Sequence, residues 1–96
     1  MKLQSIKRAS DRVHKFVATF EQDSGRTKQV AFGAAGMSDY TQHHDPERRA
    51  RYLQRHRANE DWKKPDTAGA LSRWLLWGPS TSLRDNIILF RRRFGL

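Results

Sequence analysis

The residues of this sequence with the clearest chemical potential are its arginines and lysines, and the chemistry that they suit is anion binding. The chain has 19 Lys and Arg against 10 Asp and Glu over 96 residues, a formal net charge of +9. Arginine favours planar, bidentate contacts with phosphate or carboxylate. A folded domain with this imbalance repels itself unless a polyanion or an acidic partner neutralises the charge. The sequence therefore predicts a binding or assembly role.

The cationic side chains gather near the start, in the middle and at the end of the chain. The candidate contacts for nucleic acid or an acidic partner are Lys7, Arg8, Arg48, Arg51, Arg55, Lys63, Lys64, Arg84, Arg91, Arg92 and Arg93. Residues 36–66 hold seven cations against six anions, so a solvated helix face is an equal alternative there. The C-terminal cations have only Asp85 to offset their charge locally; they are Arg84, Arg91, Arg92 and Arg93. Together with the N-terminal cations Lys2, Lys7 and Arg8, they form the better predicted polyanion site. The alternative at this end is a tail that docks in an acidic groove of another protein.

Metal and catalytic chemistry have weaker signals in this sequence. The run His43-His44-Asp45 suggests a metal centre, but the chain has no Cys and no known ligand spacing. The carboxylates lie among arginines in no catalytic spacing, and i,i+4 ion pairs such as Glu47 with Arg51 explain them more simply. Gly33-x-x-Gly36 lacks the Lys-Ser/Thr of a phosphate loop and is read as a turn. We therefore expect no enzyme activity, no metal and no cofactor.

Three tryptophans, Trp62, Trp74 and Trp77, have side chains of the kind that stack on unpaired bases. Their positions beside leucines favour core packing, because large aromatic residues dominate small cores. Trp77 lies off the predicted Leu71/Leu75 stripe and next to a Gly-Pro pair. Of the three, Trp77 is therefore the first candidate for a surface position and for base stacking, although the sequence alone does not decide whether it is buried.

The first third of the chain has the pattern of strands. Residues 13–20 alternate, with Phe16, Ala18 and Phe20 on one face, and residues 27–32 resume a strand after a turn signal at 22–25. Residues 3–8 are a candidate third strand. Because a hairpin alone is marginal in water, this sheet needs a helical cover.

The first predicted helix begins at Asp45-Pro46-Glu47 and runs to about Ala58, after a strand break at 33–36 and a polar connection over 37–44. Asp45 is suited to accept hydrogen bonds from free backbone N–H groups, and proline suits the first helical position. The spacing places Tyr52, Leu53 and His56 inward, with Arg48, Arg51 and Arg55 as an exposed ridge.

Two further helices are predicted. One spans 68–77, capped by Thr67 or Asp66 and ended by Gly78-Pro79. The last begins after a cap at Ser80, Thr81 or Ser82, has apolar residues at i, i+4, i+7 and i+11 (Leu83, Ile87, Phe90 and Phe94), and ends at Gly95.

The predicted fold class is α+β in a single domain over 1–96. A small antiparallel β-sheet of two to three strands (1–33) precedes about three helices (45–96). The start lacks an apolar signal segment, and the longest apolar run is far short of the roughly 20 residues that a membrane span needs. We expect an intracellular or virion protein that is not secreted and does not bind membranes.

Residues 32–77 carry a resemblance. The pattern Phe32-Gly33-x-x-Gly36-x-x-Asp39-Tyr40-Thr41-x-His43 is followed by Asp45-x-x-Arg48-Arg49-x-x-Tyr52-x-x-Arg55-His56, Glu60-x-Trp62 and the run Thr67-Ala68-Gly69-x-Leu71-Ser72-Arg73-Trp74-Leu75-Leu76-Trp77. It resembles a family of small basic proteins encoded by large DNA viruses of algae and protists. The Arg-rich ending differs from the Lys-rich ending typical of that family. The resemblance implies a small, non-enzymatic viral protein and supplies no catalytic residues.

Two functions from different classes follow. The first is a DNA- or RNA-binding module without strong sequence preference. The second is a structural or interaction protein, such as a minor capsid or virion component, whose arginines pair with acidic protein surfaces. The charge count alone does not separate them, because both need complementary negative charge. We favour nucleic acid.

Overall fold

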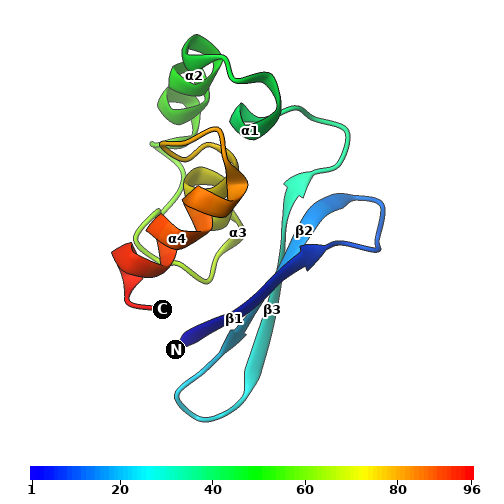
Figure 1. The fold of residues 1–96 in the computed structure, drawn as a ribbon, viewed down its shortest axis with the longest axis vertical. Coiled ribbons are helices and arrows are strands. Elements are labelled where there is room, and N and C mark those ends of the chain that lie inside the picture. The colour runs from blue at the N-terminus through cyan, green and yellow to red at the C-terminus, as the bar shows by residue number, and fades with distance from the viewer.

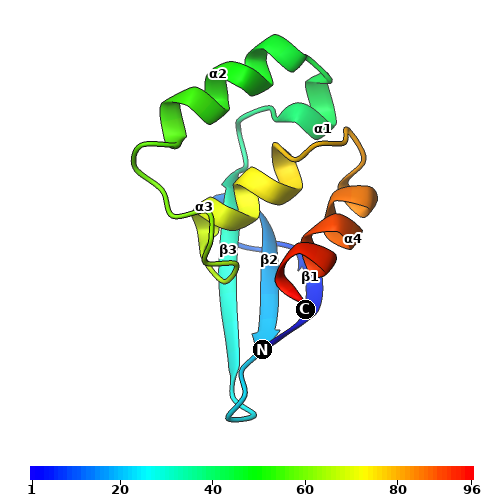
Figure 2. The same cartoon turned by 90° about the vertical axis from the view of Figure 1, so that its left-hand side faces the viewer.

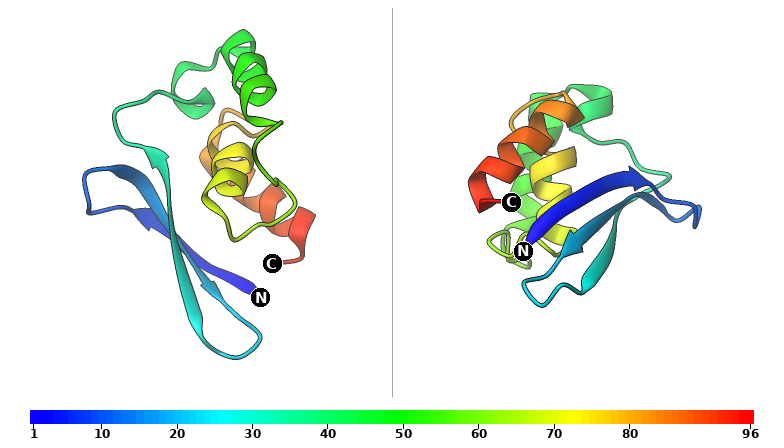
Figure 3. Two further views of the ribbon diagram at one scale, coloured as in Figure 1. Left: turned by 180° about the vertical axis from the view of Figure 1, so that it is seen from behind. Right: turned by 60° about the horizontal axis from the view of Figure 1, so that its bottom comes forward.

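Three antiparallel strands and a layer of helices form the protein, as a computed structural model of residues 1–96 shows (Figure 1). The strands β1 (Lys2–Arg8), β2 (His14–Glu21) and β3 (Thr27–Ala34) pair in the order β1-β2-β3. The helices that follow are α1 (Tyr40–His43), α2 (Pro46–His56), α3 (Ala68–Leu71), the π-helix η1 (Ser72–Leu76) and α4 (Leu83–Phe94). Figures 2 and 3 show the helices on one side of the sheet. The predicted α+β class is confirmed.

The third strand, β1, is confirmed, and its apolar residues reach the core through a bulge. Leu3 lies opposite Phe20 and Ile6 lies opposite Ala18, while the register shifts between Leu3 and Ser5. Side chains alternate along a strand, so residues three apart normally face opposite ways. One extra residue, Gln4, puts Leu3 and Ile6 on the same face.

The end of β3 differs from the prediction, because the strand continues through Gly33 to Ala34. Gly33 has a φ of +77°, and a Cβ there would lie 2.8 Å from Leu76 Cδ1 and 3.2 Å from Lys15 Cβ. Glycine therefore permits both the backbone conformation and the close approach of η1 to the sheet. The predicted polar connection over 37–44 is also wrong in part, since it contains α1, capped by the Asp39 side chain.

The start of α2 is confirmed. The Asp45 carboxylate accepts hydrogen bonds from the backbone N–H groups of Glu47 and Arg48, at 3.0 and 3.3 Å. Pro46 occupies the first turn, and the helix ends at His56, two residues before the predicted end. Its predicted inward residues are half-buried and its arginine ridge is exposed.

The helix predicted over 68–77 begins as expected, with Thr67 as its cap and Ala68 as its first residue, but it changes form after Leu71. Residues Ser72–Leu76 are π-helical, and the Trp77 N–H donates to the Ser72 carbonyl at 3.0 Å. The wider turn brings Leu75, Leu76 and Trp77 to the interior together. Trp77 is only 9% exposed, so it takes the core position favoured for the tryptophans, and the surface position considered for it is wrong.

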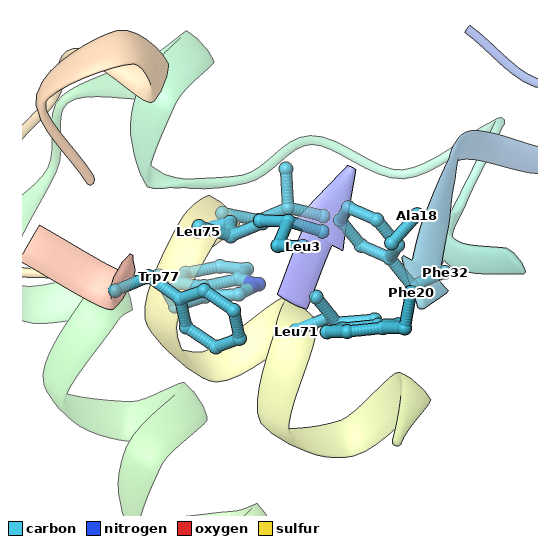
Figure 4. Close-up of a cluster of buried hydrophobic side chains, with 9 residues drawn as sticks. Leu3, Ala18, Phe20, Phe32, Leu71, Leu75 and Trp77 are labelled. Carbon is cyan, nitrogen blue, oxygen red and sulfur yellow. The ribbon is translucent and has the colours of Figure 1, made fainter. Parts of the chain in front are cut away.

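The core joins the sheet to α3, η1 and α4 (Figure 4). Phe20, Phe32 and Phe90 are its largest fully buried apolar side chains. They pack with the other members of one cluster: Leu3, Ala18, Leu71, Leu75, Leu76 and Trp77. Each buried aromatic side chain removes on the order of 150–250 Å² from water, so the aromatic members contribute most of the apolar area that this cluster buries.

The last helix, α4, begins at the Ser82 cap and ends at Gly95, whose φ is +64°, as predicted. Sequence analysis missed Asn86, which is fully buried. Its amide Nδ2 donates to the carbonyls of Leu75 and Ser80, and its Oδ1 accepts from the Ser80 N–H. Asn86 thus fixes the loop that joins η1 to α4. None of the helices is both long and apolar enough to cross a membrane.

Candidate anion-binding cleft

A cleft of about 570 Å³ lies between α2, the end of β3 and the α3–η1 segment. Arg48, Arg51 and Arg55 of α2 line it. The opposite side includes Gly33 of β3 and Gly69 of α3. We call this feature the arginine cleft.

The helical repeat explains why these arginines share one wall. Positions 48, 51, 52, 55 and 56 follow the i, i+3, i+4, i+7, i+8 spacing, which places side chains on one face of a helix. All five residues line the cleft. The ridge predicted from the sequence is therefore confirmed as a set, and two aromatic rings, Tyr52 and His56, lie beside it.

None of the 13 arginines of the chain forms an ion pair with a carboxylate. The five ion pairs involve the N-terminal amine, His14, Lys15, Lys28 and His56 instead. The predicted Glu47–Arg51 pair is absent from this set and is a wrong prediction. The guanidinium groups of the cleft therefore remain available to an external anion.

The acids that line the cleft are already engaged. Asp39 is 2% exposed and accepts from the ammonium group of Lys15. Glu60 accepts from Trp62 Nε1 at 3.1 Å and lies 3.4 Å from His56 Nδ1. The charged residues of the cleft are four cations and two anions, and both anions have partners. The uncompensated charge is carried by the three arginines.

An aromatic column runs beside the arginines. The Tyr52 ring stacks on His56 at 4.1 Å between centroids, inclined by 24°, and on Trp77 at 4.1 Å, nearly parallel at 3°. Two rings at this distance cannot share one face, so Tyr52 lies between them. Trp77 is buried and Tyr52 covers one face of its ring, so Trp77 is not available to stack on a base. The stacking role considered for it from the sequence is therefore wrong. Burial, with a smaller contribution from Glu60, raises the pKa of Tyr52 to about 12, so its hydroxyl stays protonated at neutral pH.

The arginines near the C-terminus do not form one free patch. Arg91 Nη1 donates to the Leu3 carbonyl at 2.6 Å and so ties α4 to β1. The Arg93 guanidinium lies 3.9 Å from the Trp74 ring centroid. Arg84 and Arg92 are exposed. The site that the sequence ranked higher is thus partly occupied by structural contacts.

The remaining predicted cations lie outside the arginine cleft. Lys63 and Lys64 are exposed in the connection after α2, and Lys7 is exposed near the end of β1. Arg8 lines a separate cavity of about 400 Å³, which shares Lys15 and Asp39 with the arginine cleft. From the predicted set, the structure therefore brings Arg48, Arg51 and Arg55 together in the arginine cleft. It also brings Arg92 and Arg93 together in a separate cavity of about 420 Å³ beside Trp74.

Sequence analysis missed two arginines that build the wall behind the column. Arg49 Nε donates to the carbonyls of Trp77 and Gly78, and Arg73 Nη1 donates to the Trp77 carbonyl. The Arg73 guanidinium also lies 4.2 Å from the Trp74 ring centroid. Burial, and then the nearby charges of Arg49 and Arg93, lower the pKa of Arg73 to about 10, so it remains charged at neutral pH. The inward position of Arg49 on α2 was a usable signal, whereas the π-helical turn that orients Arg73 was not visible in the sequence.

The histidines considered as metal ligands have local structural partners. His43 Nδ1 accepts from the Asp45 N–H at 2.9 Å, at the entry to α2. His44 Nε2 lies 3.1 Å from the Thr41 carbonyl. No three His, Asp or Glu side chains converge as a metal site.

We expect protonation of His43 to destabilise the fold. Desolvation, followed by the charge of Arg48, lowers the pKa of His43 below its ordinary 6.5. The unfolded chain therefore binds this proton more readily, so the contribution is complete above about pH 6.5 and is lost as the pH falls below it. Urea unfolding at pH 7.5 and 5.5 measures the loss. His43→Asn retains an acceptor for the Asp45 N–H and should show a smaller loss between these pH values. Equal losses in both proteins would contradict this assignment.

Comparison with known proteins gives a family but no function. A model described as a family of unknown function (DUF5754) matches residues 4–56, more than half of the chain. The match includes most of β1, together with β2, β3, α1 and all of α2 with its cleft arginines. It says nothing of a viral origin. No curated protein matches the chain, and no solved structure does so either.

Proposed function

Because this chain belongs to DUF5754, a family of unknown function, we propose a function from its geometry: a small, non-catalytic nucleic-acid-binding protein that contacts phosphates through the arginine cleft. One observation carries the proposal. Arg48, Arg51 and Arg55 line a single cleft, and none of them has a carboxylate partner.

The spacing of these arginines suits successive anionic groups better than a single ion. With a rise of about 1.5 Å per residue, Arg48 and Arg55 lie on the order of 10 Å apart along the helix axis. A linear polyanion offers several negative charges over such a length, whereas one small anion engages only part of the ridge. Phosphate contacts by arginine are frequently bidentate and need no particular base. The proposed binding is therefore weakly selective for sequence and strongly dependent on salt.

The salt dependence of binding tests this proposal. Affinity for a labelled oligonucleotide is measured at several salt concentrations, for the single strand and for its duplex. Arg48→Ala/Arg51→Ala/Arg55→Ala should weaken binding and reduce the log–log salt slope by about 2–3, since each neutralised phosphate contributes about 0.7–0.9.

A matched triple variant removes the same charge elsewhere. Lys2→Ala, Arg12→Asn and Arg26→Ala change exposed residues outside the arginine cleft, and Asn tolerates the φ of +63° at position 12. This control should change the slope far less. Equal losses in the two triple variants, or no binding by the unaltered protein near physiological salt, would overturn the proposal.

The alternative function, a structural or interaction protein, is supported by a different surface. Ile88 and Leu89 of α4 are each 41% exposed, and Arg84 and Arg92 are exposed on the same helix. An acidic protein surface with apolar residues would complement this face. Under this alternative, Ile88→Ser/Leu89→Ser abolishes incorporation into a complex or particle, whereas the cleft triple variant does not.

The proposal extends to the viral origin that the sequence resemblance implies, and with it to a location inside the host cell or the virion. The supporting observation is the motif order over residues 32–77. Mass spectrometry of purified particles, against lysate of infected cells, distinguishes a particle component from a protein that stays in the cell.

A further inference from the structure

We propose that the arginine cleft holds unpaired nucleotides of a single strand, with a base stacked on His56. This inference deepens the proposed function and rests on it. It names the form of nucleic acid that the cleft selects and the ring that selects it.

His56 forms the outer end of the aromatic column. Tyr52 covers one face of the imidazole ring, and Glu60 lies toward its Nδ1 edge. The side chain is nevertheless 40% exposed, and it lines the arginine cleft. We place the base on the face opposite Tyr52, where one more flat ring would extend the stack.

The column holds this ring in place before any ligand arrives. Tyr52 is fixed between His56 and Trp77, and Trp77 is held in turn by the contacts of its carbonyl with Arg49 and Arg73. Stacking a base on a ring that is already ordered costs less conformational entropy than stacking it on a mobile side chain, because the mobile side chain must be immobilised on binding. Arg55, next to His56 in sequence, also lines the cleft and places a phosphate contact beside the stacking surface.

This arrangement favours a single strand over a duplex. The exposed arginines share the face of α2 that carries Tyr52 and His56, and this face borders a cleft whose other side is lined by residues of β3 and the α3–η1 segment. An α-helix that enters a DNA major groove must instead present its contact face outward, because the groove is only about 12 Å wide. Bases in a duplex are also stacked on each other, so the open face of His56 would have no partner. A cleft of about 570 Å³ is of the size that accommodates a small organic group, such as a nucleotide.

The test compares a 12-nucleotide single strand with its blunt duplex at one salt concentration, using the intact protein. The unaltered protein should bind the single strand at least about ten-fold more tightly. His56→Ala should lower single-strand affinity about five-fold or more, since stacking of a base on an aromatic ring is worth roughly 1–3 kcal/mol. The ratio of the two affinities should then fall toward one. His56→Phe retains a flat ring and should restore the ratio.

A 2-aminopurine base in the single strand gives a second measure, because stacking quenches its emission. Quenching by the unaltered protein and by His56→Phe, but not by His56→Ala, is the expected result. A duplex that binds as tightly as the single strand would sink this inference while leaving phosphate binding by the arginines intact. Displacement of the strand by an equal concentration of adenosine monophosphate would also overturn it, because the cleft would then select free nucleotides. Absence of binding to either nucleic acid would remove the proposed function as well.

Discussion

Replacing Asn86 with alanine is expected to lower the free energy of unfolding by about 3–5 kcal/mol. The side chain is fully buried and makes three hydrogen bonds to backbone groups, one to Leu75 and two to Ser80. Each buried polar group left without a partner costs about 1–3 kcal/mol, and the missing amide leaves a void between η1 and α4. Since domains of this size are stable by only about 5–15 kcal/mol, the variant should lie near the limit of folding.

Urea unfolding, followed by far-UV circular dichroism and tryptophan fluorescence, measures this loss. Arg84→Ala is the matched control, because Arg84 is an exposed residue on the same helix with no side-chain hydrogen bond. It should change stability by less than about 0.5 kcal/mol. Amide hydrogen exchange at Ser80 should also accelerate in Asn86→Ala. A loss no larger than that of the control would show that the loop between η1 and α4 holds its position without Asn86.

Replacing Lys15 with methionine is expected to cost a comparable amount, about 3–5 kcal/mol, because it leaves a buried carboxylate without its cation. Lys15 on β2 pairs with Asp39, and the two side chains are 12% and 3% exposed. Asp39 also accepts from the Thr41 N–H at 2.9 Å as the cap of α1. The pair therefore connects the sheet to the start of the helical layer.

A double-mutant cycle separates the pair from its surroundings. Asp39→Asn keeps an acceptor for the Thr41 N–H, and Lys15→Met/Asp39→Asn removes both charges together. The double variant should lose clearly less stability than the two single losses combined. Lys28 and Asp66 supply the control pair, since these side chains are 49% and 25% exposed. Lys28→Met should cost no more than about 1 kcal/mol. A similarly small effect of Lys15→Met would refute the assigned role.

Local signals in the sequence were sufficient for most of the elements. Asp45-Pro46 and Ser82 mark helix starts by hydrogen bonds that depend on a few adjacent residues. The first start is present as predicted, and the second is one of the three caps that the sequence offered, Ser80, Thr81 and Ser82. The alternation in β2 likewise fixes which face is buried. These features depend on backbone geometry over one or two turns, so a single sequence carries them.

Features that depend on distant contacts were not predictable. The π-helical turn of η1 packs against β3 and α4. An α-helical interpretation of residues 68–77 made Trp77 a candidate for the surface, although it is buried. Gly33 was predicted to end the strand. In the structure it lies within β3, and its lack of a side chain allows Leu76 to pack closely against the sheet. The positions of the α2 arginines followed from helical spacing, but the cleft wall across from them comes from residues 15 and 33, far away in the chain.

Ionic strength should act in opposite directions on this protein and on its complexes. Thirteen guanidinium groups without a carboxylate partner repel one another in the free protein. Raising the salt concentration shortens the Debye length, from about 30 Å at 0.01 M to about 8 Å at 0.15 M, and weakens this repulsion. The same ions compete for the cleft. Added salt thus makes the isolated molecule harder to unfold, so dissociation at high salt reports competition for the arginines and not denaturation.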